Sequence, residues 1–440
     1  MPNIFLNSIN QGLFPVVIKL LIILLPIFMP IMLIVTFWIL RFRWLTLKFV
    51  ESQKSCLLEI KLPKEILKSP AGMEIFFSYL ASGGATNYGE AFIDGKTRPW
   101  FSCEIVSIGG EVKFFVWCSQ EKFRNTIESQ LYAQYPNLEI YEINQKDDYT
   151  AGIHFDMEKY FMYGVQYKLV QPDPYPIKTY IDYGLDEDPK DEYKIDPMTS
   201  LLEFFGSINA GENIWLQILI QKHEKEDWTH GVLKREARDI KAEHKAEIEK
   251  IREEATPESK GEDDKNFKFP NPTKGQNERI AALERSAGKT PFDCMIRSMY
   301  IAEGSAFNSS RISAVIGCMR QYGSNNLNTI KFKFLTDISD ERKDLTRIFP
   351  FFQSRFSFDI FDGFESNDTK ILNMKKDIFH AYKLRSFFQQ PYKHYKGKPF
   401  VMNTEELATI FHFPGGIVSQ TPTLKRVGSK KSEAPSNLPV

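Results

Sequence analysis

The residues from Leu20 to Leu40 form a run of 21 positions without a charged side chain. At a rise of about 1.5 Å per residue, a helix of this length is about 30 Å long and matches the hydrocarbon core of one bilayer. A cleavable signal peptide has a shorter apolar core that follows basic residues, whereas here Arg41 and Arg43 come after the run. A buried helix of a soluble core is the other alternative. The length and the flanks favour a single transmembrane helix over 20–40, bent by Pro26 and Pro30.

The basic residues around this run predict its orientation. Lys19 stands alone on the amino-terminal side, and four basic residues follow within about 15 positions of the other end: Arg41, Arg43, Lys48 and Lys54. The positive-inside rule therefore places 1–19 outside the cytoplasm and the chain after residue 41 inside it, at an inner membrane. Because aromatic residues also gather at membrane interfaces, the interface residues that we expect are Trp38, Arg41, Arg43, Trp44 and Lys48.

The chain as a whole has the composition of an ordinary globular protein. Its 440 residues are enough for two or three domains. Lys plus Arg and Asp plus Glu both number 56, so no overall charge attracts the chain to nucleic acid or to an acidic surface. The five cysteines are odd in number and lack a CxxC spacing. This indicates buried thiols in a reducing compartment rather than disulfides or a zinc site.

The order of the patterns after the apolar run predicts an α+β fold. Strand-like and helix-like segments follow one another as β-α-β-β-α-β over 56–63, 69–80, 99–108, 111–118, 120–136 and 138–143. Gly109 and Gly110 mark a hairpin between the two middle strands. This is the order of a ferredoxin-like unit, an antiparallel sheet with both helices on one face. We assign the unit to 51–150.

The same order recurs over 155–335, so we expect two ferredoxin-like units in tandem. The segments of the second are 160–170, 197–208, 213–221, 291–302, 309–323 and 329–334. Its two middle strands are separated by an insertion over 224–290, with charges alternating at helical spacing from 227 to 255 and a second helix over 277–287. We expect a helical hairpin of coiled-coil type. A solvated spacer is the favoured interpretation, and a docking arm for a partner is the alternative.

Basic and aromatic residues are interleaved in the α-rich region that we expect over 336–415, which a flexible basic tail over 416–440 follows. From Lys370 to Phe400, eight basic residues accompany the single acid Asp377: Lys370, Lys375, Lys376, Lys383, Arg385, Lys393, Lys396 and Lys398. Basic side chains neutralise phosphates, and aromatic rings stack on bases or enter a lipid interface. The segment is therefore a candidate contact for single-stranded nucleic acid or acidic headgroups. The favoured interpretation is a helix beginning near Asn367, with an aromatic core face and a solvated basic face.

Sequence motifs for catalysis are incomplete throughout the chain. Gly95–Lys96–Thr97 and Gly288–Lys289–Thr290 end like phosphate-binding loops, but Glu90 and Leu283 stand where the first glycine is required. The seven histidines form no HExxH motif and no cluster with cysteines. The sequence thus predicts a protein that is not an enzyme, with no cofactor, no metal and no small-molecule substrate.

Several segments resemble a known family. They are KTRPWFSCEIVSIGGEVKFFVWC (96–118), ESQLYAQYPNLEIYEI (128–143), FVMNTEELATIFHFPG (400–415) and TPTLKRVGSKKSEAPSNLP (421–439). They resemble the membrane-anchored, non-motor amino-terminal half of type IV secretion or conjugation ATPases of the candidate-phyla (Patescibacteria) type, a half that also stands alone as a domain of unknown function. In the full-length relatives SNLP leads into the motor domain, whereas this sequence ends at Val440. The resemblance therefore implies membrane anchoring, ferredoxin-like modules and a docking segment over Asn403–Phe413, without ATP hydrolysis.

Together, these features predict a non-enzymatic, membrane-anchored scaffold subunit of a type IV secretion or conjugation-like apparatus. Its cytoplasmic domains would self-associate and seat a separately encoded ATPase. The candidate docking face consists of Leu407, Ile410, Phe411 and Phe413, and packing of this face in the chain's own core is the favoured alternative. Two other functions stay open: a membrane-tethered module that binds single-stranded nucleic acid, and the anchor half of a split secretion ATPase.

Overall fold

The computed structural model describes residues 13–63, 68–82, 89–186, 195–227, 236–256, 271–335, 367–388 and 398–415. The chain divides into two compact units. The first consists of 1–52, 85–97 and 226–237. The second, here called the body, consists of 53–84, 98–225 and 238–440 and contains most, but not all, of the segments 51–150 and 155–335.

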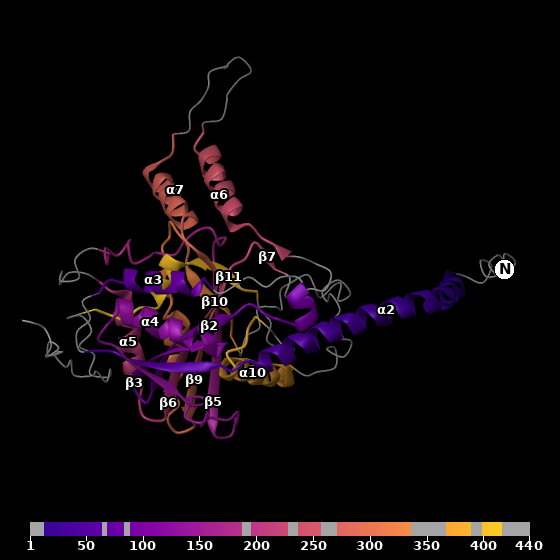
Figure 1. The fold of residues 1–440 in the computed structure, drawn as a ribbon, viewed down its shortest axis with the longest axis horizontal. Helices are drawn as coiled ribbons and strands as arrows, with labels where there is room; N and C mark the ends of the chain where they lie inside the picture. Colours follow the sequence, from indigo (N-terminus) through magenta and orange to yellow (C-terminus); the bar gives the residue numbers. More distant parts are fainter. Residues whose placement is uncertain are drawn as a thin grey trace, which may run out of the picture. The chain divides into compact units, whose positions relative to one another are not determined.

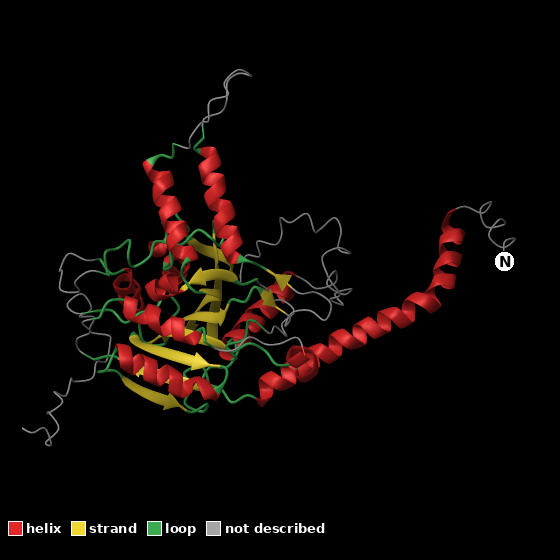
Figure 2. Ribbon diagram, turned by 45° about the horizontal axis from the view of Figure 1, so that its top comes forward, coloured by secondary structure: helices red, strands yellow, loops and turns green. Residues whose placement is uncertain are grey.

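The first unit is built around one long helix. Helix α2 spans Leu13–Ser52, which is 40 residues and nearly twice the expected transmembrane run of 21. It continues past residue 40 because the Arg, Leu and Lys residues in the next turns are good helix formers. Figure 2 shows a bend in α2 toward its amino-terminal end, for which Pro26 and Pro30 inside the helix are the expected cause. The π-helix η1 (Glu90–Asp94) and the ladder of β7 (Glu226–Asp227) with β8 (Glu236–Ala237) complete the unit.

The body contains one antiparallel sheet with the strand order β10-β5-β9-β6-β2-β3-β1-β4 (Figure 1). The elements of its first half are β1 (Cys56–Lys61), α3 (Ala71–Leu80), β2 (Trp100–Ile108), β3 (Glu111–Cys118), α4 (Arg124–Gln134) and β4 (Glu139–Ile143). Those of its second half are β5 (Tyr160–Leu169), α5 (Pro197–Gly206), β6 (Glu212–Lys222), β9 (Pro291–Glu303), α8 (Ser309–Gly317) and β10 (Ile330–Leu335). In each half the first strand lies between the third and the fourth, and the second strand lies beside the third.

The two halves share one sheet because their second strands pair with each other. Strands β2 and β6 are antiparallel in a register that runs from Trp100 opposite Gln221 to Ile108 opposite Asn213. Helices α3, α4, α5 and α8 all contribute to a core on one face of the sheet, where alternate strand residues such as Phe114 and Ile218 are fully buried. Alternation of buried side chains along each strand is what places them on a common face.

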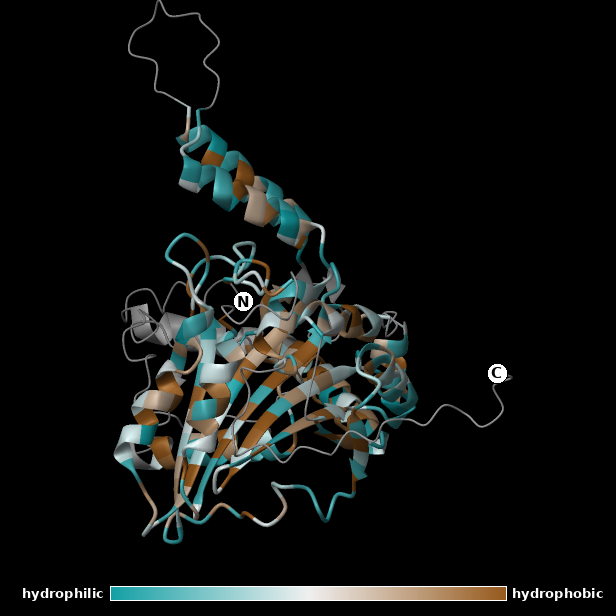
Figure 3. Ribbon diagram, turned by 90° about the vertical axis from the view of Figure 1, so that its left-hand side faces the viewer, coloured by the Kyte–Doolittle hydropathy of each residue, from teal (hydrophilic) through white to brown (hydrophobic). Residues whose placement is uncertain are grey.

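Two further helices project from the body as a pair (Figures 1 and 2). They are α6 (Ile240–Glu254) and α7 (Lys274–Ala287), and both lie in sequence between β6 and β9, as expected for the insertion. Asp239 caps α6, which therefore begins thirteen residues later than the charge pattern predicted. Ile248, Ile251 and Leu283 form a small apolar contact between the helices, and Figure 3 shows the rest of the pair as mostly hydrophilic.

The carboxyl-terminal segment adds an element to each face of the sheet. Helix α10 (Asn367–Lys383) packs against β5 on the face opposite the main core. Strand β11 (Phe400–Asn403) pairs with the first residues of β9, and α11 (Thr404–Ile410) follows it and lies against α3. The tail expected over 416–440 lies outside the described residues. The described parts of the α-rich region expected over 336–415, which are α10, β11 and α11, belong to the same compact unit as the sheet.

Candidate functional site

Helix α2 carries a long row of exposed apolar side chains. Leu25, Phe28, Leu33, Phe37 and Leu40 are each 55% to 62% exposed. The most apolar 18-residue window of Phe28–Ser52 has a mean hydropathy of 1.6, and none of that window is buried. The helix is therefore long and apolar enough to cross a bilayer, a property that it shares with signal sequences.

The expected interface residues lie on α2 at the end of the charge-free run and in the turns that follow it. The guanidinium of Arg41 lies 5.4 Å from the ring centre of Trp38, and the ammonium of Lys48 lies 5.0 Å from that of Trp44. These spacings of three and four residues put each cation and its ring on one helix face. Arg43 is also exposed on this helix. The helix therefore presents basic and aromatic groups together at one end of its apolar stretch.

The segment 89–97 packs along the same end of α2. The ring of Phe92 stacks on that of Trp38, with centroids 5.4 Å apart and an interplanar angle of 26°. Further along, Gly95 has a φ of +67°, and a Cβ at this position would lie 2.4 Å from the carbonyl carbon of Leu45. Only glycine permits this left-handed conformation together with this approach of backbone to backbone. Sequence reasoning missed the contact of Gly95 with α2, because it considered Gly95–Lys96–Thr97 only as an incomplete phosphate-binding loop.

The described basic residues between 370 and 400 lie in different environments and do not form one exposed surface. Lys376 and Lys398 are exposed, whereas Lys375 is half-buried with its ammonium 5.6 Å from the ring centre of Phe161. Lys383 donates to the carbonyl of Ile153 at 2.9 Å, and Arg385 is 4% exposed. The side chain of Lys370 and all of Lys393 and Lys396 lie outside what the structure describes. Arg385 is therefore no surface cation, and the aromatic residues Phe379, Tyr382, Phe387 and Phe388 are buried, as the favoured interpretation expected.

Arg385 instead joins a buried polar cluster on the α10 face of the sheet. Its guanidinium contacts the two carboxylate oxygens of Glu104 at 2.8 and 3.1 Å and a carboxylate oxygen of Asp148 at 2.8 Å. The hydroxyl of Tyr149 donates to the same Glu104 at 2.8 Å. Burial in itself raises the pKa of Asp148, but the charge and hydrogen bond of Arg385 outweigh it and hold that pKa below its usual value.

Strand register extends this cluster across the sheet. Glu104, Gln217 and Arg297 stand directly opposite one another on three neighbouring strands and are fully buried. The Gln217 amide donates to Glu104 at 2.8 Å, and Arg297 donates to Gln217 at 2.7 Å. Arg297 also donates to the carbonyl of Ala381 at 2.7 Å, which ties the end of α10 to the sheet. The cluster anchors an element and contains no exposed reactive group. A charged residue in the middle of an apolar strand is the signal that could have found it.

The proposed docking residues lie inside the body. Leu407, Ile410, Phe411 and Phe413 are 0% to 1% exposed and belong to the main core. Asn403 and Glu406 form a capping box, because the Asn403 side chain accepts from the Glu406 amide and the Glu406 carboxylate accepts from the Asn403 amide. The helix start expected at Asn403 is thus correct. The apolar face packs in the chain's own core, which was the favoured alternative.

A histidine and a serine meet at the base of the helical pair. Nε2 of His244 on α6 lies 3.0 Å from Oγ of Ser286 on α7, and Asn403 donates to the same oxygen at 2.9 Å. Nδ1 of His244 contacts the carbonyl of Ile240 at 2.7 Å. Burial lowers the pKa of His244. The adjoining cavity is about 10 Å³, which is room for no more than a water molecule. The pair therefore links the two helices and has no space for a substrate.

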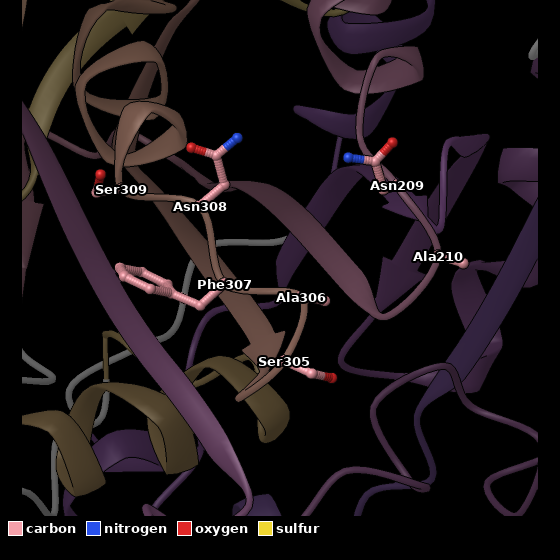
Figure 4. Close-up of a pocket in the computed structure, with 7 residues that line it drawn as sticks. All are labelled: Asn209, Ala210, Ser305, Ala306, Phe307, Asn308 and Ser309. Atoms are coloured by element: carbon pink, nitrogen blue, oxygen red, sulfur yellow. The ribbon is translucent and has the colours of Figure 1, made fainter.

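An open hollow of about 650 Å³ lies at the loops before β6 and after β9 (Figure 4). Its lining contains no ionisable side chain: Asn209, Ala210, Ser305, Ala306, Phe307, Asn308 and Ser309. Phe307 packs on Phe161 with ring centroids 4.0 Å apart, and Asn308 caps α8. These side chains have structural roles in two turns.

Comparison with known proteins places most of these elements in one family. A family model described as a domain of unknown function (DUF8128) matches residues 82–345, more than half of the chain. The match runs from the segment before η1 through β10 and includes the helical pair. No curated protein matches at a significant level.

Proposed function

The chain belongs to the DUF8128 family, a domain of unknown function, and we propose that it is a non-enzymatic scaffold held at the cytoplasmic side of an inner membrane by α2. The observation that carries this proposal is the row of exposed apolar side chains on α2. An exposed apolar helix of this length is costly in water and stable in a bilayer. The basic and aromatic residues at its carboxyl end support a cytoplasmic body under the positive-inside rule.

The buried ion pairs of the body support a scaffold role. Glu104 pairs with Arg385, Asp293 with His223, and Asp196 with His412. Each pair joins segments that are far apart in sequence, so these ionisable groups serve tertiary structure. The exposed, charge-rich helical pair α6 and α7 is the surface that we propose for partner contact.

We further propose that each half of the body is a ferredoxin-like unit. The strand order supports this proposal. In each half the first strand lies between the third and the fourth, and all neighbouring strands are antiparallel. An experimental structure in which β4 or β10 pairs elsewhere would contradict this proposal.

The partner that we propose is a separately encoded ATPase of a type IV secretion or conjugation-like apparatus. This part is supported by the resemblance of 96–118 and 400–415 to the anchor half of such ATPases. The alternative function, the anchor half of a split ATPase, is compatible with the same structure. In that case a separate chain supplies the motor domain. A nucleic-acid module has weaker support, because Arg385 is buried and Lys383 donates to a carbonyl.

The test takes the full chain in native membranes. We expect it to resist carbonate extraction, and the double variant Leu33→Arg, Phe37→Arg to be released, since both side chains are exposed on the apolar stretch. Cross-linking followed by affinity purification should then recover a nucleotide hydrolase. Charge reversal of Lys245 and Glu249 on α6 should reduce that recovery without releasing the chain. Release of the unmodified chain by carbonate, or recovery of cell-wall enzymes alone, would overturn the proposal.

A further inference from the structure

We propose that the segment Glu90–Lys96 is a second membrane contact, which places Ile93 in the headgroup layer of a phospholipid bilayer beside α2. This inference rests on the proposed anchoring by α2 and adds a site to it. Ile93 is 66% exposed, the highest value among the large apolar side chains that the structure describes in this segment and in α2. Its neighbour Phe92 stacks on Trp38 of α2.

The position of Glu90–Lys96 along α2 determines its depth in the bilayer. Phe92 contacts α2 at Trp38, two residues before the end of the charge-free run at Leu40. Gly95 contacts α2 at Leu45, which is seven residues beyond Trp38 and about 10 Å further along the helix axis. The headgroup layer on each side of a bilayer is about 5–8 Å thick. The segment between these two contacts therefore spans that layer when α2 crosses the membrane.

Several contacts hold the segment on the helix. The backbone of Gly95 lies directly on that of Leu45 and Thr46, and Thr46 is 8% exposed on a helix that is otherwise largely exposed. The ammonium of Lys96 lies 3.0 Å from Glu90 and 3.8 Å from Asp94, and the Lys96 amide donates to the carbonyl of Glu90 at 3.2 Å. The segment is thus a closed turn with Ile93 at its exposed side.

The surrounding chemistry fits a lipid surface. Apolar and aromatic side chains with cations just beyond them are typical of the membrane interface. Here Phe92, Ile93 and Trp38 form the apolar part, and Arg41 and Lys48 supply charge for acidic headgroups. The apolar surface of the segment is continuous with that of α2 through the Trp38–Phe92 stack. A bilayer around α2 therefore covers Ile93 as well.

The experiment uses the full chain in vesicles of phosphatidylcholine and phosphatidylglycerol at 7:3. An environment-sensitive fluorophore is attached to Ile93→Cys, and the unsubstituted chain, whose own cysteines are mostly buried, gives the labelling background. We expect blue-shifted emission and stronger quenching by a lipid with its doxyl group near the headgroup than by one labelled deep in the acyl chain. The same label on Lys274→Cys, where the side chain is 93% exposed on α7, is the control for non-specific quenching.

A label on Leu33→Cys separates the two proposals, because Leu33 lies within the apolar run. If that label is quenched by the deep doxyl lipid but the Ile93 label stays water-like, α2 is in the membrane and only this inference is wrong. If neither is quenched, the anchoring itself is wrong. Gly95→Val, which is incompatible with the φ of +67° and with the contact to Leu45, should return the Ile93 label to water-like emission. Asp94→Cys, 54% exposed, is a second labelling position with the same expected result.

Discussion

At the scale of single residues, the body depends on charges that have no access to water. Glu104 is fully buried, and its carboxylate accepts from Arg385, Gln217, Tyr149 and Ser102. A buried ion of this kind is tolerated only when partners satisfy it, so the loss of one partner leaves an uncompensated charge. The hydrogen bonds and the register on both sides of Glu104 explain why an acid stands in the middle of an apolar strand.

We expect Arg385→Met to destabilise the body by about 3–5 kcal/mol, because Glu104 and Asp148 then lose their shared cation in a buried site. The measurement is urea unfolding of the full chain in detergent, followed by tryptophan fluorescence. The matched control is Lys376→Met in the same carboxyl-terminal region, where the side chain is exposed and the change should be within about 0.5 kcal/mol. Equal effects of the two substitutions would contradict the structural role of Arg385.

The pair of His412 and Asp196 predicts a dependence of stability on pH. Burial by itself lowers the pKa of His412, but Asp196 at 3.2 Å and the carbonyls of Ala408 and Thr409 outweigh it and raise that pKa above its usual value. A raised folded pKa gives stability that is fully present below the unfolded value of about 6.5 and is lost as pH rises through the folded pKa. His223 beside Asp293 has the same sign, since its hydrogen bond to Asp293 outweighs burial.

We therefore expect the urea midpoint of the full chain to fall from pH 6 to pH 8. His412→Gln should reduce this fall, because glutamine carries no proton to lose, and the double variant with His223→Gln should reduce it further. An undiminished fall in the double variant would show that other groups control it.

At the scale of elements, the sheet has helices of different origin on its two faces. Helices α3, α4, α5 and α8 cover one face and come from the repeated strand and helix order. Helix α10 covers part of the other face and comes from the carboxyl-terminal region. Its close approach to β5 requires Gly164, where a Cβ would lie 2.8 Å from Cδ1 of Ile378 and 3.0 Å from Sδ of Met299.

Gly164→Ala should accordingly destabilise the body by about 1–3 kcal/mol, since the methyl group overpacks a buried contact. Ile378→Val removes Cδ1, the atom nearest to the new methyl group, so the double variant should cost less than the sum of the two single variants. Gly152→Ala is the control, because nothing lies within 4 Å of a Cβ there. Additive costs in the urea midpoints would mean that α10 does not lie on Gly164.

At the scale of the whole molecule, the join between β2 and β6 makes the two halves of the body one sheet. Nine residue pairs lie along this join, about as many as join neighbours within a half. The cluster of Glu104, Gln217 and Arg297 crosses the same join. The halves therefore share both backbone hydrogen bonds and buried side chains.

From this we predict that the body unfolds in one cooperative transition. Amide hydrogen exchange should show protection in β2 and β6 as high as in β9, since both strands are interior to the sheet. Two separate transitions in denaturant, or fast exchange along β2 and β6, would show instead that the halves open independently.

The sequence alone determined the local elements. Alternation of apolar residues, the Gly109–Gly110 turn and capping residues such as Asn403 predicted most strands and helices of the body to within about two residues, because these signals act over a few neighbouring positions. It also indicated the apolar helix, whose length and charges are local properties. It overextended the helix expected over 309–323, which ends at Gly317, because a short 3₁₀ turn over Arg320–Tyr322 follows with the same apolar spacing.

Only the tertiary structure decided which side chains meet. Arg385 and Glu104 are 281 residues apart, and their contact depends on how α10 lies on the sheet. The aromatic and basic spacing of 370–400 fits a surface or a core equally well, and burial alone separates the two. Phe92 likewise reaches Trp38 through the backbone contact at Gly95. Patterns along the chain report on neighbours within a few residues, whereas these contacts come from packing between distant segments.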